Sequence, residues 1–180
     1  MRIIRKHHPA KDALAGMAGG LAGAFLMNQF QAALAKLKSK QEGPQDREAE
    51  ARKGGGEPER EAADEPATVK AAVAVSTAVL KRELRREEKG PAGDAVHYLF
   101  GTAIGGLYGV LAGEKPAARA GFGALFGSLL WLVSDEIAVP ALGLAKSPRA
   151  YPASVHASAL GAHLVYGITT EVVRRGLRAP

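Results

Sequence analysis

Four long apolar segments, each bordered by Lys and Arg side chains, dominate the sequence. They cover residues 13–35, 95–113, 117–134 and 150–170, and their one formally charged side chain is Arg119, near the start of the third. A helix rises 1.5 Å per residue, so about 20 residues cross the roughly 30 Å hydrocarbon layer of a bilayer. We therefore expect an all-α integral membrane bundle of four transmembrane helices.

The distribution of charge separates these segments from the middle of the chain. Between Lys36 and Asp94 there are 13 basic and 13 acidic side chains, so the whole formal net charge of +6 lies outside that stretch. Basic residues beside apolar runs are typical of membrane flanks, whereas a nucleic-acid site would show a positive stripe with interleaved aromatic residues. The chain has no cysteine, which excludes disulfides and thiolate metal sites. We expect the lipid bilayer as partner, with no nucleic acid and no cofactor.

The charged middle consists of two parts with different compositions. Residues 38–66 offer little apolar surface to offset backbone ordering, which costs about 1 to 2 kcal/mol per residue, so we expect a disordered linker. In residues 67–90, apolar side chains recur at helical spacing beside Lys and Arg, but the continuous apolar run is too short to span. This pattern predicts an amphipathic interfacial helix, with a solvated helix as the alternative. Residues 1–37 then form the basic N-terminus and first transmembrane helix, and residues 91–180 the other three with a basic C-terminus.

The first segment has a second interpretation, as a secretory signal. Its basic start, its apolar stretch and the small residues Ala33 and Ala35 resemble a signal with a cleavage site. Asn28, Gln29 and Gln31 make the run polar towards its end, which favours a membrane span.

Basic side chains at both ends of the chain indicate its orientation. Four crossings put both termini on one side, and Arg2, Arg5, Arg174 and Arg175 carry the positive charge that is retained in the cytoplasm. The basic residues within 36–40 and 82–89 flank the opposite ends of the same spans and oppose this signal. We expect a multi-pass protein with both termini cytoplasmic.

Glycine recurs every four residues in the second segment, at Gly101, Gly105, Gly109 and Gly113. Such spacing lets a second helix approach closely in a membrane, which predicts glycine-zipper packing. Shorter spacings of small residues occur elsewhere, at Gly16, Gly20, Gly19, Gly23, Gly123, Gly127, Ala153, Ala157 and Gly161. The pattern leaves open whether the partner is internal, a second copy of the chain or another membrane helix, and glycine is also frequent in membrane helices in general.

Polar side chains gather at corresponding ends of the four segments. In alternating crossings, the ends of the first and third segments and the starts of the second and fourth meet at one membrane surface. The polar residues there are Asn28, Gln29, His97, Asp135, Glu136 and His156. An ionisable group at membrane depth costs about 2.5 to 3.5 kcal/mol on insertion scales and is usually paired. We therefore expect Asp135 or Glu136 to face His97 or His156.

A polar stripe follows the fourth segment. His156 and His163 are seven residues apart and nearly eclipsed on a helix, with Glu171 about 80° away. The stripe fits three interpretations: hydrogen-bonded contacts between helices, a proton or ion path, or a metal site formed by His97, His156 and a carboxylate. Because the spacing is not diagnostic of metal ligation, we expect no metal.

Pro140 and Gly143 mark the end of the third helix. Proline removes a backbone donor and glycine permits positive φ, so we expect a kink or an end near Val139. Pro152 suits the first turn of the fourth helix.

The C-terminal half resembles the YagU-like bacterial inner-membrane proteins, the family of domain of unknown function 1440. The residues that carry the resemblance are His163-Leu164-Val165-Tyr166, Glu171-Val172-Val173-Arg174-Arg175, Leu177-Arg178, Asp135-Glu136, Pro140 and Leu142-Gly143-Leu144. The resemblance implies a multi-pass protein of the bacterial inner membrane without an established activity. The long charged linker departs from the family pattern.

Two classes of function fit these features. One is a noncatalytic helix-packing scaffold, or an assembly or stress-related factor, and the alternative is a small proton-linked channel or transporter that uses the histidines and carboxylates. The sequence contains no nucleophile beside its base, no phosphate loop and no HExxH motif, so we do not expect an enzyme.

Overall fold

The computed structural model describes residues 8–41 and 65–179, and every regular element within these ranges is helical. The all-α prediction is confirmed for this part of the chain. The elements, in which η denotes a 3₁₀ or π helix, are α1 (Pro9–Gln41), α4 (Ala67–Val75), η1 (Ser76–Leu80), α5 (Arg86–Glu114), η2 (Pro116–Gly123), α6 (Ala124–Trp131), η3 (Leu132–Ala138), α7 (Val139–Ala141), η4 (Pro148–Ala150) and α8 (Ala153–Arg178). By length and composition, two helical stretches of the described residues can cross a membrane, Arg86–Glu114 and Pro116–Ala141.

The chain divides into two compact units. Unit 1 contains Met1–Asn28 and His97–Pro180, and unit 2 contains Gln29–Val96. The predicted disordered linker lies outside the described residues except at its ends, where residues 38–41 continue α1 and residues 65–66 precede α4.

In unit 2, the helix predicted over residues 67–90 is shorter than expected and ends at Leu80. Lys81 has a left-handed backbone with φ of 54°, and the Ser76 hydroxyl donates to the Arg82 carbonyl at 2.7 Å, which closes the final turn. Residues 81–85 are not helical, and only residues 86–90 of the predicted helix belong to the start of α5.

Glu88 explains why a new helix begins at Arg86. It is the third residue of α5, and its Oε2 accepts the backbone N–H of Arg85 at 2.9 Å, as in one half of a capping box. Arg82 Nη1 also lies 2.8 Å from Oε2.

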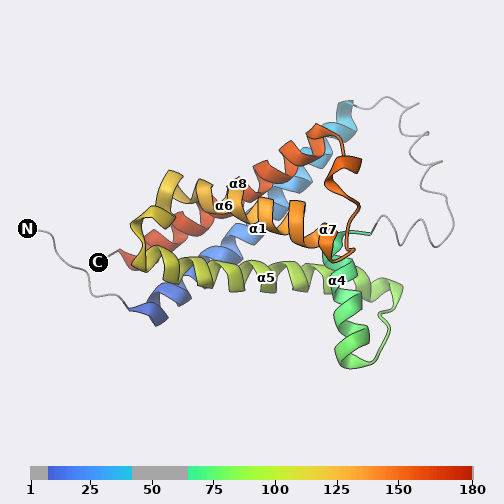
Figure 1. The fold of residues 1–180 in the computed structure, drawn as a ribbon, viewed down its shortest axis with the longest axis horizontal. Coiled ribbons are helices and arrows are strands. Elements are labelled where there is room, and N and C mark those ends of the chain that lie inside the picture. Colours follow the sequence, from blue (N-terminus) through green and yellow to red (C-terminus); the bar gives the residue numbers. More distant parts are fainter. Residues whose placement is uncertain (1–7, 42–64, 180) are drawn as a thin grey trace, which may run out of the picture. The chain divides into compact units, whose positions relative to one another are not determined.

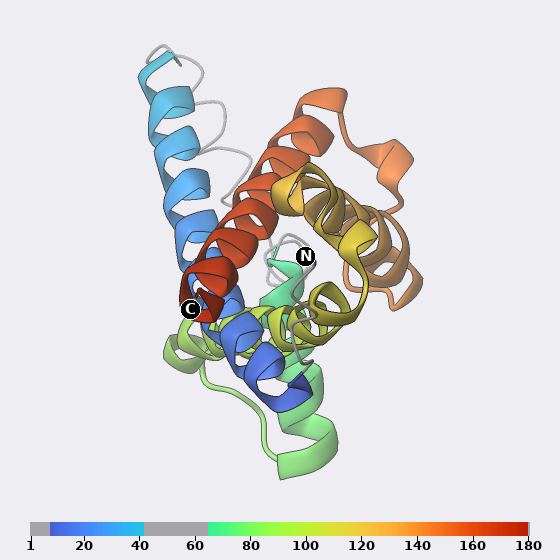
Figure 2. The ribbon, with the colours of Figure 1, turned by 90° about the vertical axis from the view of Figure 1, so that its left-hand side faces the viewer.

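The helices of unit 1 run antiparallel to their neighbours. A Cβ built on Gly16 would lie 2.7 Å from Gly109 Cα, and one built on Gly20 would lie 2.9 Å from Gly105 Cα, so α1 and α5 run in opposite directions (Figure 1). Figure 2 shows α8 (red) between α1 (blue) and α6 (gold). The chain direction therefore alternates from α1 to α5, α6 and α8.

The α1–α5 seam brings backbone against backbone. Glycines 16 and 20 of α1 interdigitate with Gly101, Gly105 and Gly109 of α5, where an added Cβ would overlap main-chain atoms or lie within 3.0 Å of Ala24 Cβ. Three of the four glycines predicted to form the groove thus face α1 within the same unit. The fourth, Gly113, is half-buried at the end of α5.

Two further seams join α8 to its neighbours. Gly19 and Gly23 of α1 meet the main chain of α8, since a Cβ at Gly19 would lie 2.5 Å from the Thr170 carbonyl oxygen. Gly123 and Gly127 face α8 on its other side. The glycine of α8 that contacts them there is Gly167. The expected small-residue face of the fourth helix is therefore misplaced: Ala153 and Ala157 are exposed and Gly161 is half-buried, because the register of α8 turns residues 163, 167 and 171 inward.

The third predicted segment starts later as an α-helix than expected. Residues 120–122 leave the helical conformation, Phe122 has φ of 59° and Gly123 has φ of 92°, so α6 begins at Ala124. Arg119 donates to the carbonyls of Ala112 and Gly113 and thereby caps the C-terminus of α5.

The third helix ends at Ala141, two residues after the expected position, and Gly143 completes a Schellman motif there. Gly143 N–H donates to the Pro140 carbonyl and Leu144 N–H to the Val139 carbonyl, both at 3.0 Å, and Gly143 has φ of 71°. Pro140 has no N–H to offer the preceding turn, and the π helix η3 ends two residues before it, at Ala138. Asp135 and Glu136 belong to this widened turn.

Burial in unit 1 is inverted relative to a soluble protein. The buried apolar side chains are mostly alanines together with Tyr108 and Tyr166, whereas Asp12, Thr170, Glu171 and Arg174 are also buried. Large apolar side chains are exposed along the helices, among them Leu14, Leu21, Phe25, Leu99, Leu107, Leu125, Leu129, Val133, Ile168 and Val172. Soluble proteins bury such residues and rarely leave large apolar surfaces in contact with water.

We predict that Gly16→Ala destabilises unit 1, because its methyl group overlaps the backbone of α5. Overpacking of this kind costs about 1 to 3 kcal/mol. Gly176→Ala is the matched control, since a Cβ there meets nothing within 4 Å and alanine favours a helix. Thermal unfolding of the two detergent-purified variants measures their stabilities. Equal midpoints for Gly16→Ala and Gly176→Ala would contradict the close backbone contact between α1 and α5.

Candidate functional site

A carboxylate–arginine cluster, formed by Tyr108, Glu171, Arg174 and Arg175, lies inside unit 1. Glu171 is fully buried, and its two carboxylate oxygens accept hydrogen bonds from the other three side chains. Tyr108 Oη donates to Oε2 at 2.8 Å, Arg174 donates from Nε at 2.7 Å and from Nη2 at 3.0 Å, and Arg175 Nε donates at 2.5 Å. The two arginines follow Glu171 by three and four residues on α8, which places all three on one helix face.

Aromatic side chains connect this cluster to the neighbouring helices. The rings of Tyr108 and Phe126 are stacked with centroids 4.1 Å apart, and Phe126 also meets Tyr166 at 5.8 Å. Tyr166 Oη donates to the Gly101 carbonyl at 2.6 Å, and the Arg175 guanidinium lies 4.0 Å from the Phe122 ring. One continuous network therefore ties α5, η2, α6 and α8 together.

A second ion pair lies between the first and last helices of unit 1. Asp12 is buried in the first turn of α1, and Arg178 Nε lies 2.8 Å from its Oδ1. A carboxylate near a helix N-terminus is also favoured by the helix dipole. The pair joins the N-terminus of α1 to the C-terminus of α8.

The histidine–carboxylate layer comprises His97, Asp135, Glu136, His156 and His163. His156 Nδ1 lies 2.6 Å from Glu136 Oε1, and His156 Nε2 lies 3.1 Å from the Pro148 carbonyl oxygen. A carbonyl only accepts hydrogen bonds, so Nε2 carries a hydrogen and a further proton is shared between Nδ1 and Glu136. The structure thus brings together Glu136 and His156, one of the expected pairings.

Asp135 forms the second contact of the layer with His163 rather than with His97 or His156. Asp135 Oδ2 lies 3.7 Å from His163 Nδ1, which is also 3.0 Å from the Ala159 carbonyl oxygen. Ser134 Oγ donates to Asp135 Oδ1 at 3.1 Å, and His97 is within electrostatic range of the same carboxylate. The layer therefore draws on α5, η3 and α8.

The two polar residues predicted on the first helix differ in placement. Asn28 Nδ2 donates to Tyr98 Oη at 3.3 Å, beside His97 in the sequence, whereas Gln29 is exposed and belongs to unit 2. Glu171 also departs from the predicted stripe, because it belongs to the carboxylate–arginine cluster and not to the layer of His156 and His163.

Sequence reasoning missed Asp12, Tyr108, Tyr166 and Arg174 as members of buried polar networks. Two signals were available: a tyrosine within each of two apolar segments, and an aspartate directly before the first. Neither signal indicates which residue the tyrosine or the aspartate contacts, because those contacts come from helices far apart in the sequence.

Within residues 8–41 and 65–179, no group of three or more His, Asp or Glu side chains is arranged to hold a metal ion. The side chains of the carboxylate–arginine cluster and of the histidine–carboxylate layer are suited to hydrogen bonding and to proton exchange.

We predict that Glu171→Gln destabilises unit 1 by about 3 to 5 kcal/mol, because Arg174 stays buried without its counter-charge. Glu87→Gln is the matched control: Glu87 is exposed and pairs at the surface with Arg85, so the change stays within about 0.5 kcal/mol. Chemical unfolding in detergent measures both variants, and equal stability for them would contradict a structural role for the cluster.

Comparison with protein families matches residues 57–172 to DUF1440, described as a protein of unknown function. The match includes the histidine–carboxylate layer and ends before the basic residues at 174–178, which therefore lie outside the matched region. No curated protein and no solved structure matches the chain. The match covers more than half of the chain, and the protein belongs to the DUF1440 family.

Proposed function

We propose that this protein is a noncatalytic helix-packing scaffold of the bacterial inner membrane that crosses the bilayer four times. The inverted burial of unit 1 carries the proposal. Exposed leucine, phenylalanine and valine faces are stable against acyl chains, and four polar side chains of α8 that lipid cannot solvate, His163, Thr170, Glu171 and Arg174, are buried.

The four crossings are α1, α5, the helical stretch Pro116–Ala141 and α8. The first has 33 residues and the last 26, so each exceeds the about 20 residues that a span needs. Their average hydropathy is lowered by polar side chains, but His163, Thr170 and Glu171 of α8 are buried against other helices. Sequence averages therefore understate how apolar the outer face of α8 is.

Two features support a scaffold. The glycine seams bring α1 against α5 and α8 at backbone distance, which leaves no room for a water-filled passage along those contacts. Each oxygen of Glu171 already accepts hydrogen bonds from protein side chains. Since the glycines are occupied within unit 1, a second copy or a partner membrane helix would bind the exposed apolar faces. The basic chain ends favour a cytoplasmic location for both termini.

The histidine–carboxylate layer supports the alternative, a proton-linked channel or transporter. Glu136, His156 and Asp135 are partly exposed, with 17%, 27% and 37% of their side chains accessible, and His163 beside Asp135 is buried, so three partly exposed titratable groups lie next to a buried one. Such a series is able to exchange protons near neutral pH.

Reconstitution separates the two functions. Liposomes that contain the purified protein and an internal pH-sensitive dye are placed in a pH gradient. A scaffold predicts the proton leak of protein-free liposomes, unchanged by His156→Ala or Asp135→Asn. Proton flux in the wild type that either substitution abolishes would overturn the scaffold in favour of transport. Addition of a protonophore at the end confirms that the vesicles held their gradient.

A further inference from the structure

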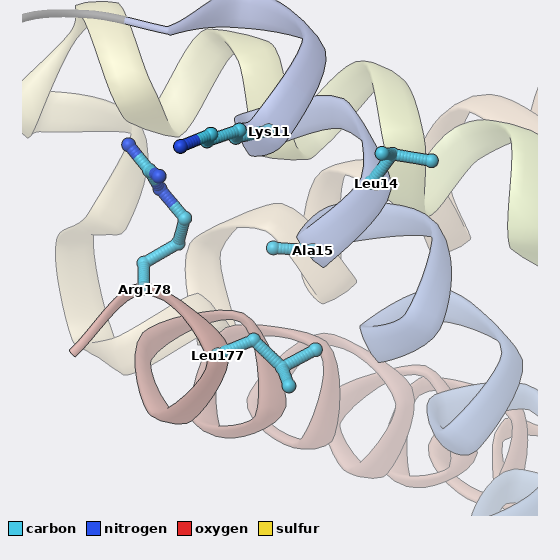
Figure 3. A pocket seen from close by; sticks show the side chains of 5 residues that line it. All are labelled: Lys11, Leu14, Ala15, Leu177 and Arg178. Atoms are coloured by element: carbon cyan, nitrogen blue, oxygen red, sulfur yellow. The ribbon is translucent and has the colours of Figure 1, made fainter. Parts of the chain in front are cut away.

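A small hollow opens between the first and last helices of unit 1, beside the Asp12–Arg178 ion pair. Its volume is about 260 Å³, and it is lined by Lys11, Leu14 and Ala15 of α1 and by Leu177 and Arg178 of α8. Figure 3 shows the Lys11 amino group and the Arg178 guanidinium near one another, with the Leu14 side chain of α1 and the Leu177 side chain of α8 away from them, each on its own helix. The hollow therefore combines a cationic end with an apolar end.

The cationic end carries excess positive charge. The charged side chains of α1 and α8 nearest this end are Lys11, Asp12, Glu171, Arg174, Arg175 and Arg178, which leaves a net charge of +2. The ion pair with buried Asp12 holds the Arg178 guanidinium in place at the rim. Lys11 is exposed and extends from the first turns of α1 towards the same point. An anionic group placed there meets two positively charged side chains.

In the proposed membrane location, the apolar end of the hollow lies where acyl chains begin. Leu14 is 65% exposed and Leu177 is 60% exposed, so neither is covered by another part of unit 1. Lys11 precedes the first apolar segment by two residues, and Arg178 follows the fourth by eight. In a membrane-spanning protein this position corresponds to the headgroup region, where basic side chains attract anionic lipids.

We infer that this hollow binds one anionic phospholipid, with the headgroup phosphate between Lys11 and Arg178 and an acyl chain along Leu14 and Leu177. The inference rests on the proposed membrane location. A soluble phosphate would use only the cationic end, and a zwitterionic lipid would bring a second positive charge into a site that is already positive. The combination of both ends selects a lipid with net negative charge.

Titration of the detergent-purified full chain with phosphatidylglycerol and with phosphatidylcholine, read by native mass spectrometry, tests the inference. The wild type is expected to retain phosphatidylglycerol preferentially. Lys11→Gln weakens that binding about fivefold, because one basic residue near an anionic headgroup is removed. Lys115→Gln is the charge-matched control, since Lys115 is exposed directly after α5 and does not line the hollow.

Leu177→Ser tests the apolar end, and it is expected to weaken phosphatidylglycerol binding without changing any charge. Equal retention of the two lipids, an equal loss in Lys115→Gln, or competition by glycerol phosphate at the same affinity as the lipid would each overturn the inference. Measurements on the same purified protein distinguish failure of the proposed membrane function from failure of the proposed lipid site. A protein that stays dissolved without detergent contradicts the membrane function, whereas a detergent-dependent protein without headgroup preference contradicts only the lipid site.

Discussion

Close approach of helix backbones at glycine determines how unit 1 is built. Where Gly16 and Gly20 meet Gly105 and Gly109, a single methyl group would overlap main-chain atoms. Helices at this distance gain dispersion contacts between their backbones. These contacts stabilise the packing in place of the hydrophobic burial that holds helices together in water. The space normally filled by leucine and isoleucine is absent, so the large apolar side chains turn outward.

Polar networks then supply the contacts that an aliphatic core would provide. Tyr108 and Tyr166 each reach across to a neighbouring helix, and Glu171 is bound by groups from two helices. The Tyr166–Gly101 contact lies within the glycine seams, and Glu171 and His163 each lie beside a seam glycine, Gly123 and Gly127 respectively. Polar contacts beside the seams fix the register of helices whose glycine faces alone would permit sliding.

Much of this arrangement follows from patterns in the sequence, and the exceptions have physical causes. Alternating helices bring the end of the third segment to the start of the fourth, and Glu136 does contact His156. The inward orientation of Glu171 could not be predicted, since helical periodicity gives its angle to His163 but not which face meets Tyr108. The positive φ of Phe122 could not be predicted from the sequence either, because phenylalanine rarely adopts it. The turn is required only by the contact between Gly123 and α8.

Collision accessibility of nitroxide labels tests the central claim that the exposed apolar faces of unit 1 contact lipid. The chain has no cysteine, so single labels at Leu107→Cys and Leu129→Cys report only those faces, and Ser147→Cys reports the loop before α8. In liposomes, both leucine positions should collide mainly with oxygen, which dissolves in lipid, and the serine position with a water-soluble nickel chelate. Leucine positions that collide mainly with the nickel chelate would contradict the account.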